Sequence, residues 1–309
     1  MAFDTVFTDP GPSASPRHPG VSASGLARAF GRLPPTALLL LSILSVQLGS
    51  ALATVLFSGL GPAGTALAST AFAAAALTLL SPPRLDVRLR RRALLVLAFG
   101  LANACMVLPF FLALQYIPLG IAATIGFLGP LGIAVATSRR PVHFLCIAIA
   151  MAGIALLTPE VGGNLDPRGL ALAGLAAVAW AAFVPLSKRA GGVFDGIDGL
   201  TFALWAAIPL LLPFALAEGT MFGAGARDLA GAFAVALLTT VLPMALEYRA
   251  LQRVSARVYG ILMTLEPAIG ALVGAICLGQ LIAARLSLAV ACVTVAALGV
   301  TLSERGDKS

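Results

Sequence analysis

Residues 81–115 read SPPRLDVRLRRRALLVLAFGLANACMVLPFFLALQ, a short basic stretch followed by a long apolar run. Another apolar run, 62–80, ends just before it. The arginines between Arg84 and Arg92 are therefore confined to one gap between two segments long enough to cross a bilayer core of ~30 Å. Lys and Arg collect in such gaps on the cytoplasmic side of membrane proteins. The stretch predicts a membrane protein with helices on both sides of an arginine-rich connection.

The composition fits a chain that faces lipid over most of its surface. Of the 309 residues, 59% are hydrophobic and 11% are charged, and the mean hydropathy is +0.99. Soluble domains carry roughly 25% charged residues, so these few charges could not cover a water-facing surface. The formal net charge is +7, but the basic residues lie in gaps between apolar runs and not along a face that could bind nucleic acid. The sequence thus predicts a lipid bilayer as the surroundings and no nucleic-acid partner.

Ten apolar runs are long enough to cross the bilayer. Their connections are short, so neighbouring runs must be antiparallel. With the N-terminus in the cytoplasm, all but three of the 20 Lys and Arg residues fall on the cytoplasmic side; the exceptions are Arg168, Arg227 and Arg285. This bias predicts an even number of spans and two cytoplasmic termini. The runs are 36–57, 62–80, 93–115, 119–138, 142–158, 169–187, 198–217, 229–248, 258–278 and 282–303.

Two parts of the chain match at a spacing of 137 residues. Residues 113–115 read ALQ and are followed by LGP at 128–130, while residues 250–252 read ALQ and are followed by LEP at 265–267. Coincidence between Ala- and Leu-rich helices is the alternative, but two matches in the same register favour a repeat. A repeat of five spans, an odd number, inserts its two copies with opposite topology, as in secondary transporters.

The predicted fold is therefore an all-α membrane protein with ten transmembrane helices, arranged as two inverted five-helix repeats. The first repeat covers 36–158 and the second covers 169–303. Residues 1–35 are rich in Pro, Ser, Ala and Gly and are predicted to form a disordered cytoplasmic tail. Residues 304–309 form a short cytoplasmic tail at the other end.

Glu266 is the strongest candidate for a functional side chain. The ninth run starts near Arg257, and nine residues at ~1.5 Å each place Glu266 about 14 Å into the bilayer. An ionised group there costs roughly 2.5–3.5 kcal/mol and marks a functional site by default. We expect Glu266 to bind substrate or exchange a proton; a structural hydrogen bond to a neighbouring helix is the alternative. Pro130 and Pro267 occupy matching positions in the two halves and predict symmetric helix bends beside the site.

Further polar side chains lie within apolar runs or at their ends. Gln47, Asn103 and Gln115 could hydrogen-bond the ammonium or carboxylate of a substrate, or could bond across helices for about 0.6 kcal/mol each. Gln115 corresponds to Gln252 in the second half, and Tyr116 follows Gln115 in the connection. We treat Gln47, Asn103, Gln115 and Tyr116 as candidate substrate contacts.

Three more candidates lie on the sixth and eighth spans. Trp180 is in the middle of its span, where Trp is less usual than at the interface, and it is predicted to line a cavity. Glu247 and Tyr248 lie near the cytoplasmic end of their span beside Arg249. They form either an ion pair at the interface or part of an inner gate.

No motif for a cofactor, a metal or catalysis is present. The sequence lacks a Walker loop, HExxH and GxSxG, and its four cysteines show no metal-ligand spacing. His18 precedes the first apolar run, and His143 lies at the cytoplasmic end of the fifth, beside Arg139 and Arg140. The sequence thus predicts a protein that is not an enzyme and that needs no cofactor.

Four segments resemble the drug/metabolite transporter superfamily with two EamA-type domains, and within it the RhtA-like, threonine/homoserine exporter branch. This resemblance implies a bacterial cytoplasmic (inner) membrane protein that exports small amino acids and related metabolites. The family pattern has Glu where this chain has Gly126 and Gln280, and the first difference leaves the exact substrate open. The segments are ALQYIPLGIAATIGFLGPL (113–131), SRRPVHF (138–144), AVAWAAFVPLSKRA (177–190) and LPMALEYRALQRVSARVYGILMTLEPAIGALVGAICLG (242–279).

The sequence as a whole predicts a secondary active exporter that works by alternating access, with proton antiport through Glu266. The substrate is a small amino acid or related metabolite, and a homodimer is left open. One alternative is a drug/metabolite exporter of broader specificity in the same superfamily, which an aromatic, less polar cavity would favour. An alternative of another class is a membrane-embedded enzyme or a scaffold that transports nothing.

Overall fold

In the computed structural model, the described part of the chain consists of helices and their connections, as the sequence predicts. Several predicted features lie outside it, namely most of the N-terminal tail, the C-terminal tail, the SRRPVHF segment, Gln252 and Arg257. The described residues are 33–85, 87–136, 145, 148–153, 165–251, 253, 259, 262–281 and 284–303.

Among these residues, five helical stretches are long and apolar enough to cross a membrane. Each coincides with one or more of the predicted runs. The five are α2 (Pro35–Leu80), α4 (Ala93–Ala113), α8 (Pro167–Gly191), α9 (Asp198–Glu218) and the stretch Ala226–Glu247, which comprises α10 (Ala226–Ala236), the π-helix η3 (Leu237–Val241) and most of α11 (Leu242–Leu251). The other elements are α3 (Val87–Arg91), α5 (Leu119–Gly126), α6 (Leu128–Ala136), the 3-10 helix η2 (Thr220–Gly223), α13 (Glu266–Leu278) and α14 (Ala284–Ser303).

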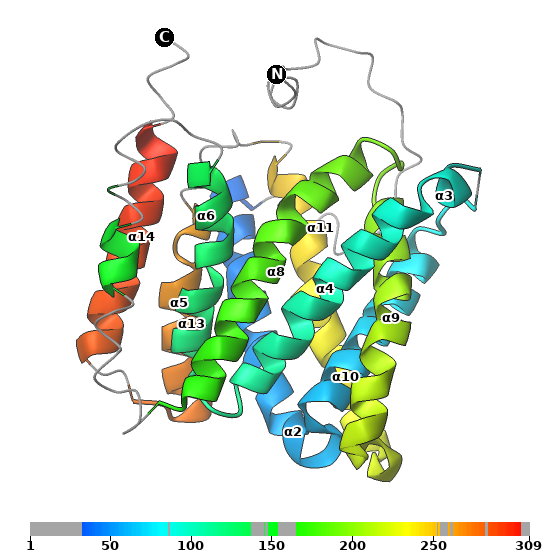
Figure 1. Ribbon diagram of the computed structural model, residues 1–309, viewed down its shortest axis with the longest axis horizontal. Coiled ribbons are helices and arrows are strands. Elements are labelled where there is room, and N and C mark those ends of the chain that lie inside the picture. Colours follow the sequence, from blue (N-terminus) through cyan, green and yellow to red (C-terminus); the bar gives the residue numbers. More distant parts are fainter. Residues whose placement is uncertain are drawn as a thin grey trace. The chain divides into compact units, whose positions relative to one another are not determined.

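The 46 residues of α2 contain two of the predicted runs, joined by a sharp bend at Gly61. Gly61 has φ +67° and ψ 165°, a backbone conformation that glycine adopts readily because it has no Cβ. Pro62 follows, and its missing N–H costs nothing at the first position of the second limb. The chain turns back at this bend (Figure 1), so α2 supplies two limbs and not one straight helix.

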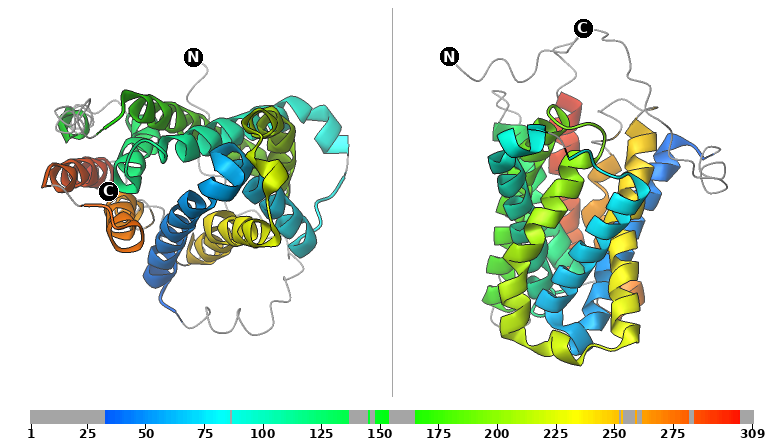
Figure 2. Two further views of the ribbon diagram at one scale, coloured as in Figure 1. Left: turned by 90° about the horizontal axis from the view of Figure 1, so that it is seen from below. Right: turned by 90° about the vertical axis from the view of Figure 1, so that its right-hand side faces the viewer.

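Small residues bring neighbouring helices into close contact. A Cβ atom on Gly120 of α5 would lie 2.7 Å from the Cα atom of Ala271 in α13, and one on Gly129 of α6 would overlap the carbonyl oxygen of Ala177 in α8. Such close approach is the usual way for helices to associate in lipid, where apolar burial gives no preference for helix over lipid. Both contacts join the first half of the sequence to the second. α2 likewise packs against α9, α10 and α11, and both views in Figure 2 show α10 and α11 (yellow) beside α2 (blue).

Polar side chains cap helix ends near the bend of α2. The Oε2 atom of Glu218, the last residue of α9, accepts hydrogen bonds from the backbone N–H groups of Ala63 (2.9 Å) and Gly64 (3.2 Å). The hydroxyl of Thr220 donates to the carbonyl oxygen of Leu60 at 2.6 Å. The first N–H groups of a helix have no partner within it, and a carboxylate there also interacts favourably with the helix dipole. The end of α9 is thereby tied to the start of the second limb of α2.

A second cap of this kind joins α13 to α5. The backbone N–H of Leu119, the first residue of α5, donates to Oε1 of Gln280 at 3.1 Å. Gln280 stands where the family resemblance leads us to expect Glu. An amide oxygen accepts a hydrogen bond as a carboxylate oxygen does, so this replacement keeps the cap while removing a negative charge.

Replacing Glu218 by Ala is expected to lower the free energy of unfolding by about 1–2 kcal/mol, because two backbone donors lose their acceptor. The change can be followed by thermal unfolding of the detergent-solubilised protein. Glu218→Gln keeps an accepting oxygen and serves as the matched control, with a smaller expected loss. An Ala variant as stable as the unmodified chain would contradict the capping role.

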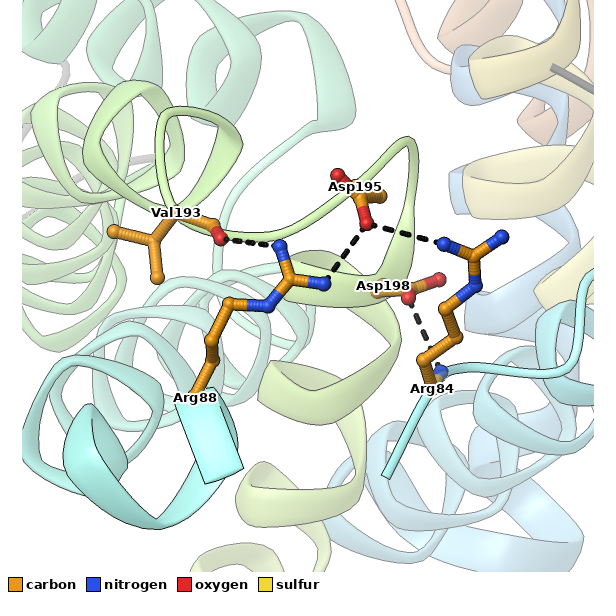
Figure 3. A network of polar contacts seen from close by, with 5 residues as sticks. All are labelled: Arg84, Arg88, Val193, Asp195 and Asp198. Atoms are coloured by element: carbon orange, nitrogen blue, oxygen red, sulfur yellow. Dashed lines mark hydrogen bonds and ion pairs between the residues drawn. The ribbon is translucent and has the colours of Figure 1, made fainter. Parts of the chain in front are cut away.

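An arginine–aspartate network joins the connection before α3 to the connection between α8 and α9 (Figure 3). The guanidinium of Arg88 donates to Asp195 at 2.9 Å and to the carbonyl oxygen of Val193 at 3.4 Å. Arg84 forms an ion pair with Asp195 at 3.5 Å, and its backbone N–H donates to Asp198 at 3.2 Å. The arginine-rich stretch that predicted a membrane-bordering connection therefore fixes the loop at the start of α9.

Candidate substrate cavity

A cavity of about 610 Å³ lies between helices of both sequence halves. This volume is within the range of roughly 300–1,000 Å³ typical of small-molecule sites. The cavity reaches the α8–α9 connection at Gly196 and Ile197, next to the arginine–aspartate network. Its wall is mainly apolar. The polar side chains that line it are Gln47, Ser50, Ser69, Thr70, Asn103, Ser187, Thr239, Thr240, Glu247, Tyr259 and Glu266.

The two carboxylates in this wall differ in their hydrogen bonding. Glu247 of α11 accepts from the hydroxyl of Ser42 at 2.7 Å through Oε1 and from the hydroxyl of Tyr259 at 3.0 Å through Oε2. Each oxygen therefore has a good donor. This arrangement ties α11 to α2 and to Tyr259, and it holds the Glu247 carboxylate in place.

The carboxylate of Glu266 is more weakly hydrogen-bonded than that of Glu247. Among the described residues, only Gln47 donates to it, with 3.4 Å between Nε2 and Oε1. That distance lies beyond the usual range of 2.7–3.2 Å for an N–H···O bond. The sequence predicted Glu266 within a continuous span, but the chain turns at Thr264 and Leu265, and Glu266 begins α13. The cause is local, because Pro267 has no N–H to donate to the carbonyl oxygen of Met263 and its ring clashes with that carbonyl.

Two buried amide oxygens in the same wall have no donor among the described residues. They are Oε1 of Gln47, whose residue is 2% exposed, and Oδ1 of Asn103, whose residue is 5% exposed. An unpaired polar atom inside a protein costs roughly 1–3 kcal/mol, and such atoms call for a specific explanation. Two buried amide oxygens and one carboxylate, on α2, α4 and α13, thus lack a good donor among the described residues.

Helices beside the cavity are broken at two positions, one before Pro130 and one before Pro267, which occupy equivalent places in the two halves. α5 ends at Gly126 and α6 begins at Leu128, two residues before Pro130. In the second half the turn at 264–265 precedes Pro267 in the same way. Gly126 and Met263 lie four residues before these prolines, and both line the cavity. The prolines themselves are not part of the wall.

Aromatic side chains form much of the remaining wall. Trp180 of α8 lines the cavity and meets the ring of Phe127 edge-on, with 6.4 Å between the ring centres. A Cβ atom on Gly126 would lie 3.9 Å from the Trp180 ring, which is ordinary contact. The position where the family resemblance leads us to expect Glu is therefore an open space beside an indole ring.

The described geometry is a partly polar cavity enclosed by apolar helices from both sequence halves. The family model described as the EamA-like transporter family matches residues 167–302. Two threonine/homoserine exporters RhtA, from Salmonella typhimurium (strain SL1344) and Escherichia coli (strain K12), are each 35% identical to this chain over 276 residues. The alignments cover 88% of this chain and 93% of each relative. The chain belongs to the EamA-like transporter family.

The EamA-like family assigns the chain to membrane transporters and not to enzymes, in the branch that contains the RhtA exporters. It is accordingly a multi-pass protein of the inner membrane. A crystal structure that is 19% identical aligns with a TM-score of 0.57 over 88% of this chain and 99% of the other. At that identity the likeness supports the fold alone.

The structure of this EamA-like chain brings five of the predicted site residues to one cavity. These are Gln47, Asn103, Trp180, Glu247 and Glu266. Gln115 and Tyr116 lie in the exposed turn between α4 and α5 and are not part of the cavity wall. Tyr248 lies in α11, and its side chain is outside the described part of the chain.

Sequence reasoning missed several polar residues of the wall. Tyr259 and Ser42, the donors to Glu247, are 12 and 205 residues away from it in the sequence, so no helical spacing relates the three. Thr239 and Thr240 lie in the π-helix η3 and also line the cavity. Short π-helical segments occur frequently at functional sites. In the sequence, the two consecutive threonines shortly before a proline could have indicated polar residues of the cavity.

Replacing Tyr259 by Phe is expected to destabilise the protein by roughly 1–3 kcal/mol, since Oε2 of Glu247 loses its donor inside the protein. Thermal unfolding in detergent measures the loss. The exposed Tyr116 allows a matched control, because Tyr116→Phe removes the same hydroxyl outside the cavity. Equal melting temperatures for the two variants would argue against the Glu247 contact.

Proposed function

We propose that this chain is a secondary active exporter of small amino acids, threonine- and homoserine-like, or of related metabolites, across the cytoplasmic membrane. The observation that carries the proposal is its 35% identity to exporters named for threonine and homoserine over 88% of the chain. The cavity supports it, because a partly polar space between the two sequence halves is where secondary transporters bind substrate. Alternating access would then expose the cavity to either side of the membrane in turn.

The proposed architecture is ten transmembrane helices in two inverted repeats. Support comes from helix breaks that precede Pro130 and Pro267, prolines at the same repeat spacing. A reversal at Gly61 gives two crossings within α2. Discontinuous helices at the repeat interface are a recurring feature of secondary transporters.

The proposed orientation places both termini in the cytoplasm. In that orientation the arginines from Arg84 to Arg92 lie on the cytoplasmic side, as the positive-inside bias requires. The cavity then extends toward the cytoplasm, because it reaches the α8–α9 connection that Arg84 and Arg88 hold. The caps by Glu218 and Gln280 fall on the opposite side, where they tie helix ends together. This arrangement suits a conformation that loads substrate from the cytoplasm.

Glu266 is the proposed coupling residue. It lies in the cavity wall with one long hydrogen bond from the described residues, so it can exchange a proton or a substrate group without breaking a strong contact. Glu247, whose two oxygens both have donors, is proposed to hold α11 in position. Proton antiport through Glu266 would link export to the proton gradient.

The test of the proposed function is efflux of preloaded, labelled threonine and homoserine from cells that express the chain. We expect faster loss of label than from cells with an empty vector, and no difference in the rate for a sugar that carries no amine. Efflux equal to that of the empty-vector cells for both amino acids would contradict the proposed substrates.

A broader drug/metabolite exporter is the second candidate function, favoured by the character of the cavity wall. Aromatic and Met side chains contribute a large part of it. A cavity of about 610 Å³ also has room for more than one small amino acid. Protection of expressing cells against bulky, amphipathic cations would support this candidate over an amino-acid exporter. The wall includes Phe99, Met106, Phe110, Phe111, Trp180, Phe183, Met244 and Met263.

A further inference from the structure

Three acceptor groups in the cavity wall lack a good hydrogen-bond donor from the described part of the chain. The carboxylate of Glu266 has one long hydrogen bond, and Gln47 Oε1 and Asn103 Oδ1 have no donor among the described residues. Three of the hydroxyls in the wall donate to backbone carbonyl oxygens, including that of Thr239, which donates to Val235 at 2.8 Å. Ser50 and Ser69 each donate to a carbonyl oxygen one helical turn earlier, at 2.9 Å and 2.7 Å. A ligand that supplies hydrogen-bond donors would satisfy these acceptors.

The helix breaks add two more acceptors. A proline has no N–H, so Pro130 and Pro267 deprive the carbonyl groups of Gly126 and Met263 of their helical partners. Both residues line the cavity. The two positions are related by the 137-residue repeat, so each half of the chain contributes one such carbonyl next to the same space.

The charge of the cavity wall also favours a ligand that donates hydrogen bonds and is positively charged. The described residues that line the cavity include two carboxylates, Glu247 and Glu266, and no Lys or Arg. A carboxylate group on a ligand would find no cationic partner among them. An ammonium group presents three N–H donors, no acceptor and a positive charge, which matches both the missing donors and the sign of the charge.

We infer that the cavity recognises its substrates by a positively charged amine, held by Glu266 together with Gln47 and Asn103, and that it does not require their carboxylate. The inference rests on the proposed export function and narrows it to a chemical class. Amino alcohols and amino-acid amides should be substrates alongside free amino acids. An amine and a proton would compete for Glu266, which couples the two fluxes.

Competition in proteoliposomes tests this inference with the purified full chain. Exchange of labelled threonine is measured against unlabelled threoninol, threonine amide, N-acetylthreonine and 3-hydroxybutanoate. The first two keep the amine and lack a free carboxylate, and we expect them to compete nearly as well as threonine. The last two lack a charged amine and should compete at least about tenfold more weakly, the loss expected when charge-assisted hydrogen bonds are removed.

Two variants of Asn103 sharpen the test. Asn103→Leu removes the acceptor and should raise the half-saturation concentration for threonine and threoninol alike, by about tenfold. Asn103→Asp retains an oxygen and should keep amine binding. Size-exclusion chromatography in detergent verifies folding, and if the Leu variant does not fold, the competitor series and the Asp variant decide.

Three results would overturn the inference. Competition by N-acetylthreonine without competition by threoninol would show that the site recognises the carboxylate, while export itself would stand. Displacement of threonine by Na⁺ alone would assign the acceptors to a metal cation. Absence of any threonine or homoserine exchange would remove the proposed function, and the amine site with it.

Discussion

Replacing Glu266 by Gln is expected to reduce threonine efflux from preloaded cells at least about tenfold, to the level of cells that lack the protein. The amide keeps the size of the side chain but cannot carry a proton or pair with an ammonium group. Among the described residues, the 3.4 Å contact with Gln47 is the one hydrogen bond of Glu266, so the substitution removes a functional charge and little structural support. The rate of efflux at several external pH values measures the effect.

Glu218→Gln is the matched control for that experiment. It makes the same chemical change at a carboxylate outside the cavity wall, and the amide oxygen can still accept from Ala63 and Gly64. We expect its efflux to stay close to that of the unmodified chain. Equal efflux in Glu266→Gln, Glu218→Gln and the unmodified chain would remove Glu266 from the mechanism.

Replacing Gly129 by Ala is expected to cost about 3 kcal/mol or more in stability and to lower the melting temperature by on the order of 10 °C. The new Cβ atom would overlap the carbonyl oxygen of Ala177 and lie 3.1 Å from the backbone nitrogen of Ala181. Because these are backbone atoms of α8, no side-chain rotation relieves the overlap. The helices α6 and α8 would have to separate. Thermal unfolding in detergent and the yield of monodisperse protein report the change.

Gly132 provides the control on the same helix. No described atom lies within 4 Å of the Cβ position there, and Ala is a better helix former than Gly. Gly132→Ala should therefore be neutral or slightly stabilising. A Gly129→Ala protein as stable as Gly132→Ala would show that α6 and α8 do not pack as closely as described.

Much of the fold could be predicted from the sequence because lipid imposes simple rules. The apolar runs gave the helices, since only a helix satisfies its own backbone within a bilayer. The turn at Gly61 fell in the gap between two predicted runs. What could not be predicted was the way helices end inside the membrane, such as the break at Thr264 and Leu265. A proline predicts an interruption of the helix, but it does not determine whether the helix bends, stops or restarts.

The candidate site was only partly predictable for a similar reason. An ionisable or amide side chain within an apolar run is conspicuous, so Gln47, Asn103 and Glu266 could be named from the sequence. The packing partners of those groups depend on contacts between distant helices. The sequence therefore could not show that each oxygen of Glu247 has a close donor while Glu266 has only the long contact with Gln47 among the described residues. Nor could it show that Gln115 faces outward from a turn.

Exchange of protons for amino-containing solutes is the activity proposed for this chain, and transport into liposomes tests it most directly. The purified protein is reconstituted into liposomes with an acidic interior, and uptake of labelled threonine is followed. Antiport predicts accumulation of threonine above the external concentration while protons leave, and collapse of that accumulation when a protonophore is added. Uptake no greater than in protein-free liposomes, with a folded protein, would contradict the account.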